Sequence, residues 1–215
     1  MALVATNTEE NGTVWALWRI EESSDELLQK YAEKKGPISD ALKQKKDQVL
    51  AQSLAARLAL AACTDISALF TGSNGEPRIP QGFVSLSHTT QYGLAAFHPE
   101  FPVGIDLEGP RPQILRIADK FSTAEERSHF TQENLESGLL VLWTCKEAVF
   151  KAYGKGDVDF REHIQVAPFY PADQGQLAVH FGLDTQAWQV DYSKREDLTI
   201  TLALARPQPN GPLSV

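Results

Sequence analysis

The chain has 215 residues, 42% of them apolar, which is enough to build one large domain or two small ones around a buried core. Its net charge of -8 argues against sequence-independent binding to nucleic acids, which depends on neutralising phosphates, but it leaves room for a locally basic pocket. No run reaches the roughly 18–20 apolar residues of a membrane span, so we expect neither a nucleic acid nor a membrane as a partner.

The first half of the chain alternates strand-forming and helix-forming segments. The segment SSDELLQKYAEK offers Ser23 or Ser24 as a helix N-cap, with Glu26 available for a capping box. The next helix is alanine-rich, and we expect it to break near Lys46. The predicted elements are a strand over 13–20, helices over 23–34 and 39–64, two strands within 83–97 around a polar turn at 88–91, and a strand over 101–108.

The second half contains the strongest helix signal and most of the remaining strands. Ser122 and Glu125 have the spacing of a capping box, and Gly154 is placed to end a helix. The predicted elements are helices over 113–121, 122–130 and 139–153, then strands over 163–169, 176–181, 187–192 and 198–205. This order indicates an α+β protein with an N-terminal half, 1–100, and a C-terminal half, 101–215. A ligand cleft is expected between the two halves.

Two acidic residues interrupt the buried-strand pattern of GIDLE. Alternate residues of a strand share a face, so Asp106 and Glu108 point one way while Val103, Ile105 and Leu107 point into apolar packing. Paired carboxylates repel each other unless a cation lies between them, and hard oxygen ligands suit Mg²⁺. The alternative interpretation is a strand with one solvated face.

The helix of WTCKEAVFKAYGKG carries a third carboxylate. Trp143, Glu147, Lys151 and Gly154 are three or four residues apart and therefore form one ridge. Glutamate and lysine four residues apart, as Glu147 and Lys151 are, usually form an exposed ion pair on a helix. Because the flanking residues are apolar on several sides, we expect these two side chains to line a cleft instead, with the lysine available to a phosphate.

A short polar sequence, SLSH, ends the strand before the turn at 88–91. His88 could be an ordinary polar turn residue. Opposite an acidic metal site, however, Ser87 and His88 could hydrogen-bond a phosphate group.

Taken together, SLSH at 85–88, GIDLE at 104–108 and WTCKEAVFKAYGKG at 143–156 resemble the motif set of the Sfp-type 4'-phosphopantetheinyl transferases. The resemblance implies two similar α/β halves related by a pseudo-two-fold axis, with the active site at their interface. It also implies an enzyme that moves the 4'-phosphopantetheine arm of coenzyme A to a serine hydroxyl of an apo acyl or peptidyl carrier protein. The second product is adenosine 3',5'-bisphosphate, and the reaction depends on Mg²⁺.

The resemblance assigns roles residue by residue. It implies Asp106, Glu108 and Glu147 as metal ligands, with Glu147 also the base for the serine hydroxyl. It implies Glu147, Lys151 and His88 as catalytic residues, and coenzyme A binding by Ser87, His88, Lys146, Lys151 and Arg78. The family often has lysine where this chain has Glu76, and Arg78 is the candidate substitute. Candidates for holding the 3'-phosphate are Lys43, Lys45, Lys46 and Arg57.

The partner protein must be recognised locally, because carrier proteins are usually acidic and so is this chain. Arg111, Arg116 and Lys120 could form a basic docking patch, or simply the solvated face of a short helix. Cys63 and Cys145 belong to no CxxC pair, so we expect reduced thiols, no zinc and a cytoplasmic protein. Two pseudo-repeated halves would complete one site, so we expect a monomer.

Two alternatives to the transferase remain open at this stage. One is a non-catalytic module that binds coenzyme A or a carrier protein and keeps the fold; the change at Glu76 supports it. The other is a different Mg²⁺-dependent phosphotransferase, although the chain has no P-loop or kinase-like glycine motif.

Overall fold

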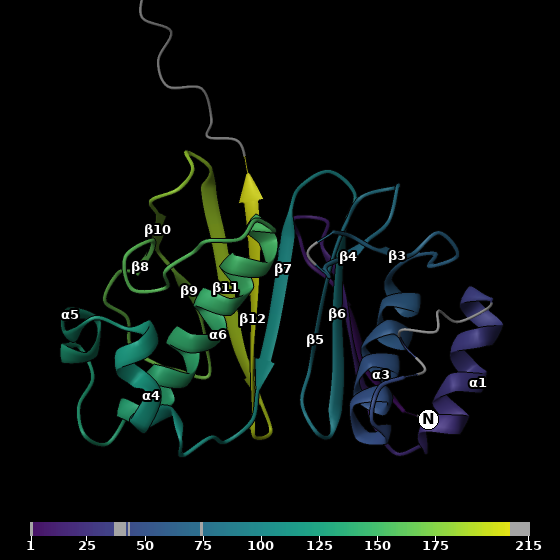
Figure 1. Cartoon of the computed structure of the whole chain (residues 1–215). Coiled ribbons are helices and arrows are strands. Elements are labelled where there is room, and N and C mark those ends of the chain that lie inside the picture. Colours follow the sequence, from purple (N-terminus) through teal and green to yellow (C-terminus); the bar gives the residue numbers. More distant parts are fainter. Residues whose placement is uncertain (1, 37–41, 43, 74, 207–215) are drawn as a thin grey trace, which may run out of the picture.

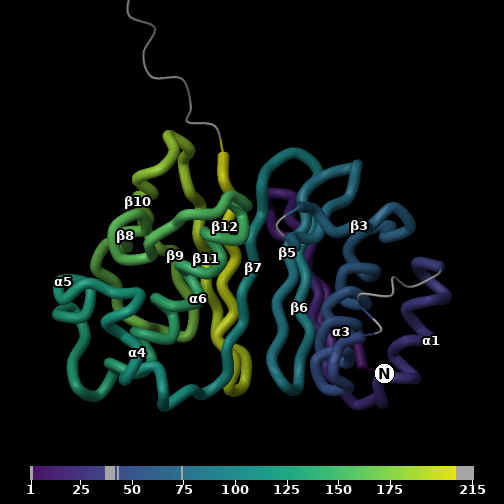
Figure 2. Tube along the Cα trace, in the orientation of Figure 1, coloured from purple at the N-terminus to yellow at the C-terminus, as the bar shows by residue number. Residues whose placement is uncertain are grey.

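Two antiparallel sheets face each other at the centre of the molecule, and helices cover their outer faces (Figure 1). The computed structural model describes residues 2–36, 42, 44–73 and 75–206. The layers run from α6 through the C-terminal sheet and the N-terminal sheet to α3 and α1, as the Cα trace also shows (Figure 2). This is the expected α+β fold, with a sheet and helices in each half.

The N-terminal sheet has the strand order β1-β2-β6-β5, and a small β3-β4 hairpin lies beside it. Ser23 is the N-cap of α1 and shares a capping box with Glu26, as predicted. The expected break near Lys46 is also confirmed, because Lys46 is the N-cap of α3. The elements are β1 (Leu3–Thr8), β2 (Val14–Arg19), α1 (Ser24–Lys35), α3 (Asp47–Cys63), β3 (Phe70–Thr71), β4 (Pro77–Arg78), β5 (Phe83–His88) and β6 (Tyr92–His98).

The C-terminal sheet has the strand order β7-β12-β11-β9, and β10 pairs with β8 in a separate ladder. Gly154 ends α6 in the left-handed conformation, with φ 67° and ψ 10°, as predicted. The elements are β7 (Val103–Glu108), α4 (Ile114–Phe121), α5 (Ala124–Ser128), α6 (Leu135–Tyr153), β8 (Ile164–Val166), β9 (Gln174–Leu177), β10 (Val179–Phe181), β11 (Ala187–Arg195) and β12 (Leu198–Arg206).

Two local predictions need correction, and one strand was missed. The capping box of α5 is formed by Thr123 and Glu126, one residue later than the Ser122–Glu125 pair predicted for it. The strand expected over 176–181 is two strands, because β9 pairs with β11 whereas β10 turns away to pair with β8. Strand β1 was not predicted, because it lies at an exposed sheet edge and has no buried face to give it an apolar alternation.

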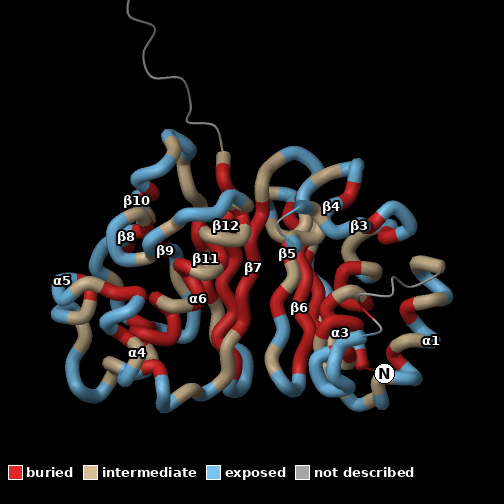
Figure 3. The backbone as a smooth tube through the Cα atoms, in the orientation of Figure 1, coloured by how far each residue is buried: buried red, intermediate tan, exposed pale blue. Residues whose placement is uncertain are grey.

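The two sheets share one apolar core. Val103, Ile105 and Leu107 of β7 pack against residues of β2, β6 and β12 between the sheets, which confirms the face predicted for them. Figure 3 shows the buried backbone concentrated in these central strands and in the helices that face them. The opposite face of β7 is thereby turned toward α6.

Glycines allow each long helix to lie directly on its sheet. A Cβ atom on Gly104 would come within 1.8 Å of the Ala148 carbonyl oxygen in α6. A Cβ atom on Gly93 of β6 would come within 2.2 Å of the Ala56 nitrogen in α3. The contact at Gly104 sets the height of α6 over β7, and therefore the separation of the polar side chains that the two elements carry.

Neither cysteine is in a disulfide, and burial raises the pKa of both the Cys63 and Cys145 thiols to about 12. Both are therefore poor nucleophiles. In the part of the chain that the structure describes, no helix is long and apolar enough to cross a membrane.

Candidate functional site

Ser87, Asp106 and Lys151 form a bonded cluster where β5, β7 and α6 meet. The Ser87 hydroxyl donates to Asp106 Oδ1 over 2.6 Å, and Lys151 Nζ lies 2.6 Å from the same oxygen. Lys151 also donates to Ser87 Oγ over 3.0 Å and to the Ile105 carbonyl over 3.3 Å. Asp106 and Lys151 meet through the packing of α6 on β7 within the C-terminal half, and the packing of the two halves brings Ser87 of β5 to them.

Glu108 also has a cationic partner. Its Oε2 lies 2.7 Å from Arg111 Nη1, and the Arg111 guanidinium lies 5.8 Å from the centroid of the Trp143 ring. Arg111 was expected in a docking patch on the basis of its position in the sequence. In the structure its guanidinium points toward β7 and α6, and the i,i+3 spacing of Arg111 from Glu108 is consistent with this ion pair.

Glu147 lies near this group without being bonded to it. Among the described residues it makes no hydrogen bond or ion pair. Burial, followed by repulsion from Asp106 and then from Glu108, raises the pKa of Glu147 to about 7, with Lys151 and Arg111 opposing the shift. Around neutral pH this carboxyl is therefore divided between its protonated and ionised forms, which is the range in which a general base is effective.

Positive charge gathers beside His88 at the end of β5. His88 is exposed, yet partial desolvation of its ring lowers its pKa, and the charges of Lys151, Lys45 and Arg57 lower it further. Lys45 Nζ donates to Ser53 Oγ over 2.8 Å, and Arg57 donates to the Ser53 carbonyl over 2.9 Å. The neutral imidazole therefore lies in the field of three cations, which favours an anionic ligand.

The remaining basic candidates lie differently. Lys46 is an exposed residue at the start of α3, and Lys43 lies outside the described residues. Arg78 of β4 is half exposed and lies 2.6 Å from Glu76 Oε1. Arg78, the candidate substitute for the family's lysine, is therefore ion-paired with Glu76, which occupies the position of that lysine.

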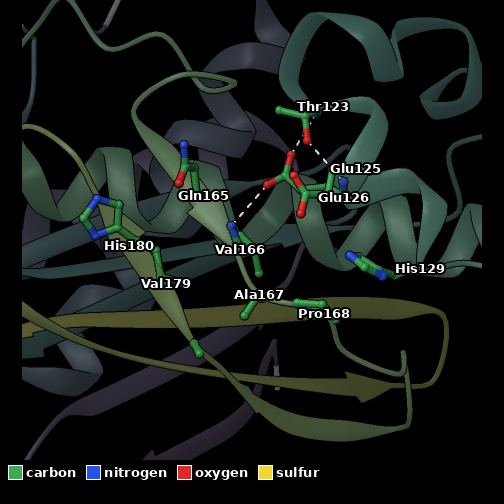
Figure 4. A pocket seen from close by; sticks show the side chains of 11 residues that line it. Thr123, Glu125, Glu126, His129, Gln165, Val166, Ala167, Pro168, Val179 and His180 are labelled. Atoms are coloured by element: carbon green, nitrogen blue, oxygen red, sulfur yellow. Dashed lines mark hydrogen bonds between the residues drawn. The ribbon is translucent and has the colours of Figure 1, made fainter.

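Lys146 has contacts outside this group. It is fully buried, and its ammonium lies 2.8 Å from Glu126 Oε1 and 2.9 Å from Glu126 Oε2 and from the Phe160 carbonyl. Glu126 in turn accepts hydrogen bonds from the backbone amides of Val166 and Thr123 (Figure 4). These contacts tie α6 to α5 and β8, a buried network that the motif resemblance did not indicate.

The donor chemistry of the three carboxylates suits Mg²⁺, but their arrangement does not form a metal site in this structure. Among the described residues, no three His, Cys, Asp or Glu side chains are grouped so that they could hold a metal ion. Asp106 is engaged by Lys151, and Glu108 is engaged by Arg111. The three carboxylates are therefore suitable ligands for Mg²⁺ by their chemistry, but their present positions do not form a site for the ion.

A cavity of about 470 Å³ lies elsewhere in the C-terminal half, between α5 and the β8-β10 ladder (Figure 4). Glu125, His129 and His180 line it together with apolar side chains such as Val179. None of the predicted site residues lines it.

Comparison with known proteins agrees with the motif arrangement. Residues 102–203, which contain Asp106, Glu147 and Lys151, match the family model of the 4'-phosphopantetheinyl transferase superfamily. This region of the chain is similar to that superfamily. The bonded cluster of β7 and α6 therefore lies within the part of the chain that defines the superfamily relationship.

Individual transferases match segments of 83 to 129 residues. The 4'-phosphopantetheinyl transferase psf-1 of Bacillus pumilus is 37% identical over 92 residues, which is 40% of this chain and 39% of that protein. A Synechocystis protein provisionally given the transferase name is 33% identical over 129 residues, 53% of this chain and 52% of that protein. The Sfp transferase of Bacillus subtilis is 31% identical over 83 residues, 37% of each chain. The chain thus spans about half, or less, of the curated relatives it matches.

Proposed function

We propose that this protein is a 4'-phosphopantetheinyl transferase. It would move the phosphopantetheine arm of coenzyme A to a serine hydroxyl of an apo acyl or peptidyl carrier protein, leaving adenosine 3',5'-bisphosphate. The observation that carries the proposal is the Ser87–Asp106–Lys151 cluster, with Glu147 beside it, at the junction of the two halves. Its β7 and α6 parts lie inside the region matched by the superfamily.

Coenzyme A would bind across the positive group beside His88. Phosphoryl transfer is catalysed mainly by positioning and charge stabilisation, so cations around the phosphates are the main requirement. Lys45, Arg57 and Lys151 supply these cations, and neutral His88 can donate one N–H to a phosphate oxygen. We propose Lys45 and Arg57 for the 3'-phosphate and Lys151 with His88 for the diphosphate.

Glu147 would act as the base. A serine hydroxyl is a weak nucleophile at neutral pH, and a carboxylate with a pKa near the working pH can accept its proton as the new bond forms. The pKa of about 7 of Glu147 meets this condition. The absence of any bonded partner among the described residues leaves its two oxygens available to substrate, water or a metal ion.

The superfamily uses coenzyme A and Mg²⁺ in general. We propose Asp106, Glu108 and Glu147 as the ligands, and this requires Lys151 and Arg111 to leave the two carboxylates that they now engage. When bound, the ion would neutralise charge on the diphosphate.

The carrier protein would dock on α4, which begins a few residues after Glu108. Leu115 is 46% exposed on this helix, and Arg116 and Lys120 are exposed beside it. An apolar side chain flanked by cations suits an acidic helix with an apolar face. A monomeric, cytoplasmic enzyme with halves 1–100 and 101–215 completes the proposal.

Incubation with coenzyme A, Mg²⁺ and a panel of apo carrier proteins tests the proposed function. Intact-mass measurement should show a gain of one phosphopantetheine group on at least one carrier, with release of adenosine 3',5'-bisphosphate. Absence of any gain across fatty-acid, polyketide and peptide carriers would contradict the proposal.

A second candidate, a non-catalytic module that binds coenzyme A, is favoured by the Glu76–Arg78 pair in place of a free family lysine. Calorimetry separates the two candidates. Coenzyme A binding that is unaffected by Mg²⁺ and accompanied by no transfer supports the binding module, whereas Mg²⁺-dependent binding supports the enzyme.

A further inference from the structure

A second cleft opens between the two sheets, on the side where β1 and β9 lie. It has a volume of about 540 Å³ and is lined by the β1-β2 hairpin on one side and by β9 and β11 on the other. The predicted catalytic, metal and coenzyme residues lie outside its lining. We infer that this cleft and the free edge of β1 together bind an extended segment of a partner protein that carries basic side chains at alternate positions. The inference goes beyond the proposed function and does not rest on it.

The inner face of the C-terminal sheet changes from apolar to polar at the cleft. The residues of β12 that face the N-terminal sheet are leucine and isoleucine. Their register partners on β11, and the neighbouring residues of β9, are polar and line the cleft: Gln189, Asp191, Ser193, Arg195, Gln174 and Gln176. Polar side chains are unfavourable in an apolar core, so this part of the face suits an occupant that forms hydrogen bonds.

Strand β1 presents an open backbone edge beside this cleft. One of its edges pairs with β2, and no described strand pairs with the other. Every second residue of β1 therefore directs its N–H and C=O toward the open edge. The strand sequence LVATNT has no charge and no proline, which are the usual protections of an edge, and Val4 is 47% exposed. A bulge between Leu3 and Ala5 leaves the pairing of 5–8 regular. The edge can therefore accept a further strand.

The other sheet edges of the described chain are less open. Strands β5 and β7 lie against each other, and β9 has only four residues. The position of β1 also matters, because Asn7 is in register with the core residue Trp15 and its side chain lines the cleft. Side chains of a strand alternate between its two faces, so every second side chain of a strand added to β1 would point toward the cleft. An extended peptide matches this arrangement.

The charges of the cleft favour basic side chains at those positions. Its lining holds three carboxylates, Glu9, Glu10 and Asp191, and one cation, Arg195. Among the described residues none of the three carboxylates is in an ion pair, although Glu9 accepts a hydrogen bond from Trp15 Nε1 over 2.6 Å. The Arg195 guanidinium lies 4.9 Å from the centroid of the Trp15 ring. Lysine or arginine side chains on the peptide would compensate the excess negative charge.

A second copy of the chain is a poorer occupant of the same edge. Its own β1 would bring no basic side chain to the cleft. Each chain has a net charge of -8, so two copies also repel each other at long range. The carboxylates of both clefts would remain uncompensated.

Binding of a labelled synthetic peptide that alternates lysine with valine, followed by fluorescence anisotropy with the whole protein, tests the inference. The peptide should bind, and a version with glutamate in place of lysine should bind at least about tenfold more weakly. Hydrogen exchange of the backbone amides of β1 should slow when the lysine peptide is bound.

Methylated peptides test the pairing with β1. Methylation of the backbone nitrogen of every lysine, or of every valine, removes the N–H donors of one peptide edge and leaves the charge unchanged. One of these two peptides should bind at least about tenfold more weakly than the parent, and the other should bind like the parent. A peptide held by charge alone would not distinguish the two edges.

Variants of the protein test the charge of the cleft. Glu10→Gln combined with Asp191→Asn removes two carboxylates and should weaken binding of the lysine peptide at least about tenfold. Glu162→Gln removes an exposed carboxylate outside the cleft and should not change binding. Glu9 is left unchanged in these variants because it bonds Trp15.

Four results would overturn the inference. They are no binding of the lysine peptide, equal binding by the two methylated peptides, unchanged binding by the double variant, and self-association of the protein that slows exchange in β1 without any peptide. The last result would assign the edge to a second copy. Since no readout involves coenzyme A or a carrier protein, each of these results is distinct from failure of the proposed function.

Discussion

At the scale of single residues, the candidate site is governed by how its charges are compensated. Asp106 has Lys151 and Glu108 has Arg111, whereas Glu147 has no bonded partner among the described residues. A buried carboxyl near two other carboxylates has a lower free energy in its protonated form than in its ionised form. The raised pKa of Glu147 therefore also makes the unfolding free energy of the protein depend on pH.

We predict that Glu147→Gln removes a pH dependence of stability. With a pKa of about 7 in the folded state and an ordinary value of 4.5, the folded protein binds more protons than the unfolded chain between these values. Its unfolding free energy therefore falls as pH rises through this range. Urea titrations of the metal-free protein should show Glu147→Gln matching the unmodified protein at pH 4 and exceeding it by on the order of 2–3 kcal/mol at pH 8.

The exposed Glu162 supplies a control for that measurement. Glu162→Gln should follow the unmodified protein at every pH. If Glu147→Gln did the same, its carboxyl would titrate as an ordinary one and would lose its main qualification as a base.

The buried pair Lys146–Glu126 gives a second prediction at this scale. Lys146→Met leaves Glu126 charged and buried without its cation, which should lower the unfolding free energy by roughly 3–5 kcal/mol. Chemical denaturation measures this loss, with Lys155→Met as the exposed lysine control. A loss below about 1 kcal/mol would mean that the pair does not hold α6 to α5.

At the scale of elements, the contact between β7 and α6 places the site. We predict that Gly104→Ala lowers the unfolding free energy by about 3 kcal/mol, because its Cβ atom would meet the backbone of Ala148 and neither element can yield locally. Gly109→Ala is the matched control, since nothing lies within 4 Å of a Cβ atom there. Similar unfolding midpoints for the two variants would contradict this account of the packing.

Many elements could be predicted from sequence because their signals are local. The Ser23–Glu26 capping box, the break at Lys46 and the C-terminal Gly154 all depend on neighbouring residues. The division of 176–181 between β9 and β10 could not be predicted, because it depends on pairing with β11 and β8. The shift of the α5 capping box to Thr123 follows from a choice between two adjacent hydroxyl residues that sequence spacing alone does not decide.

The site shows the same limit. The strand alternation correctly indicated that Asp106 faces away from the inter-sheet core, and the helix ridge indicated Lys151. The bond between Lys151 and Asp106 spans 45 positions along the chain and depends on the packing of α6 on β7. The bond between Lys151 and Ser87 spans 64 positions and exists only because the two halves pack together. Lys146, on another side of α6, is buried because it pairs with Glu126. That pairing depends on how α5 packs beside α6, which the local sequence does not specify.

At the scale of the whole molecule, the two sheets depend on each other. Strands β7 and β12 contribute seven of the twelve buried residues of the shared core. Removing the N-terminal sheet would expose these seven: Val103, Ile105, Leu107, Leu198, Ile200, Leu202 and Leu204. An exposed apolar face of this size is expected to cause aggregation.

We therefore predict one cooperative unfolding transition for the whole chain, coincident by tryptophan fluorescence and circular dichroism. A fragment of residues 101–215 should aggregate or show no cooperative transition. A fragment that unfolds cooperatively by itself would mean that the C-terminal half is an independent domain.

The most direct test of the central claim is the rate at which a receptive apo carrier protein gains phosphopantetheine with Asp106→Asn in place of the unmodified protein. Asp106 bonds both Lys151 and Ser87, and it is one of the three proposed metal ligands. The account predicts a fall of roughly a hundredfold or more with an unchanged fold, while Glu162→Gln keeps the original rate. A rate for Asp106→Asn within about threefold of the original would contradict the account, since loss of an essential charged group at a reacting centre costs far more.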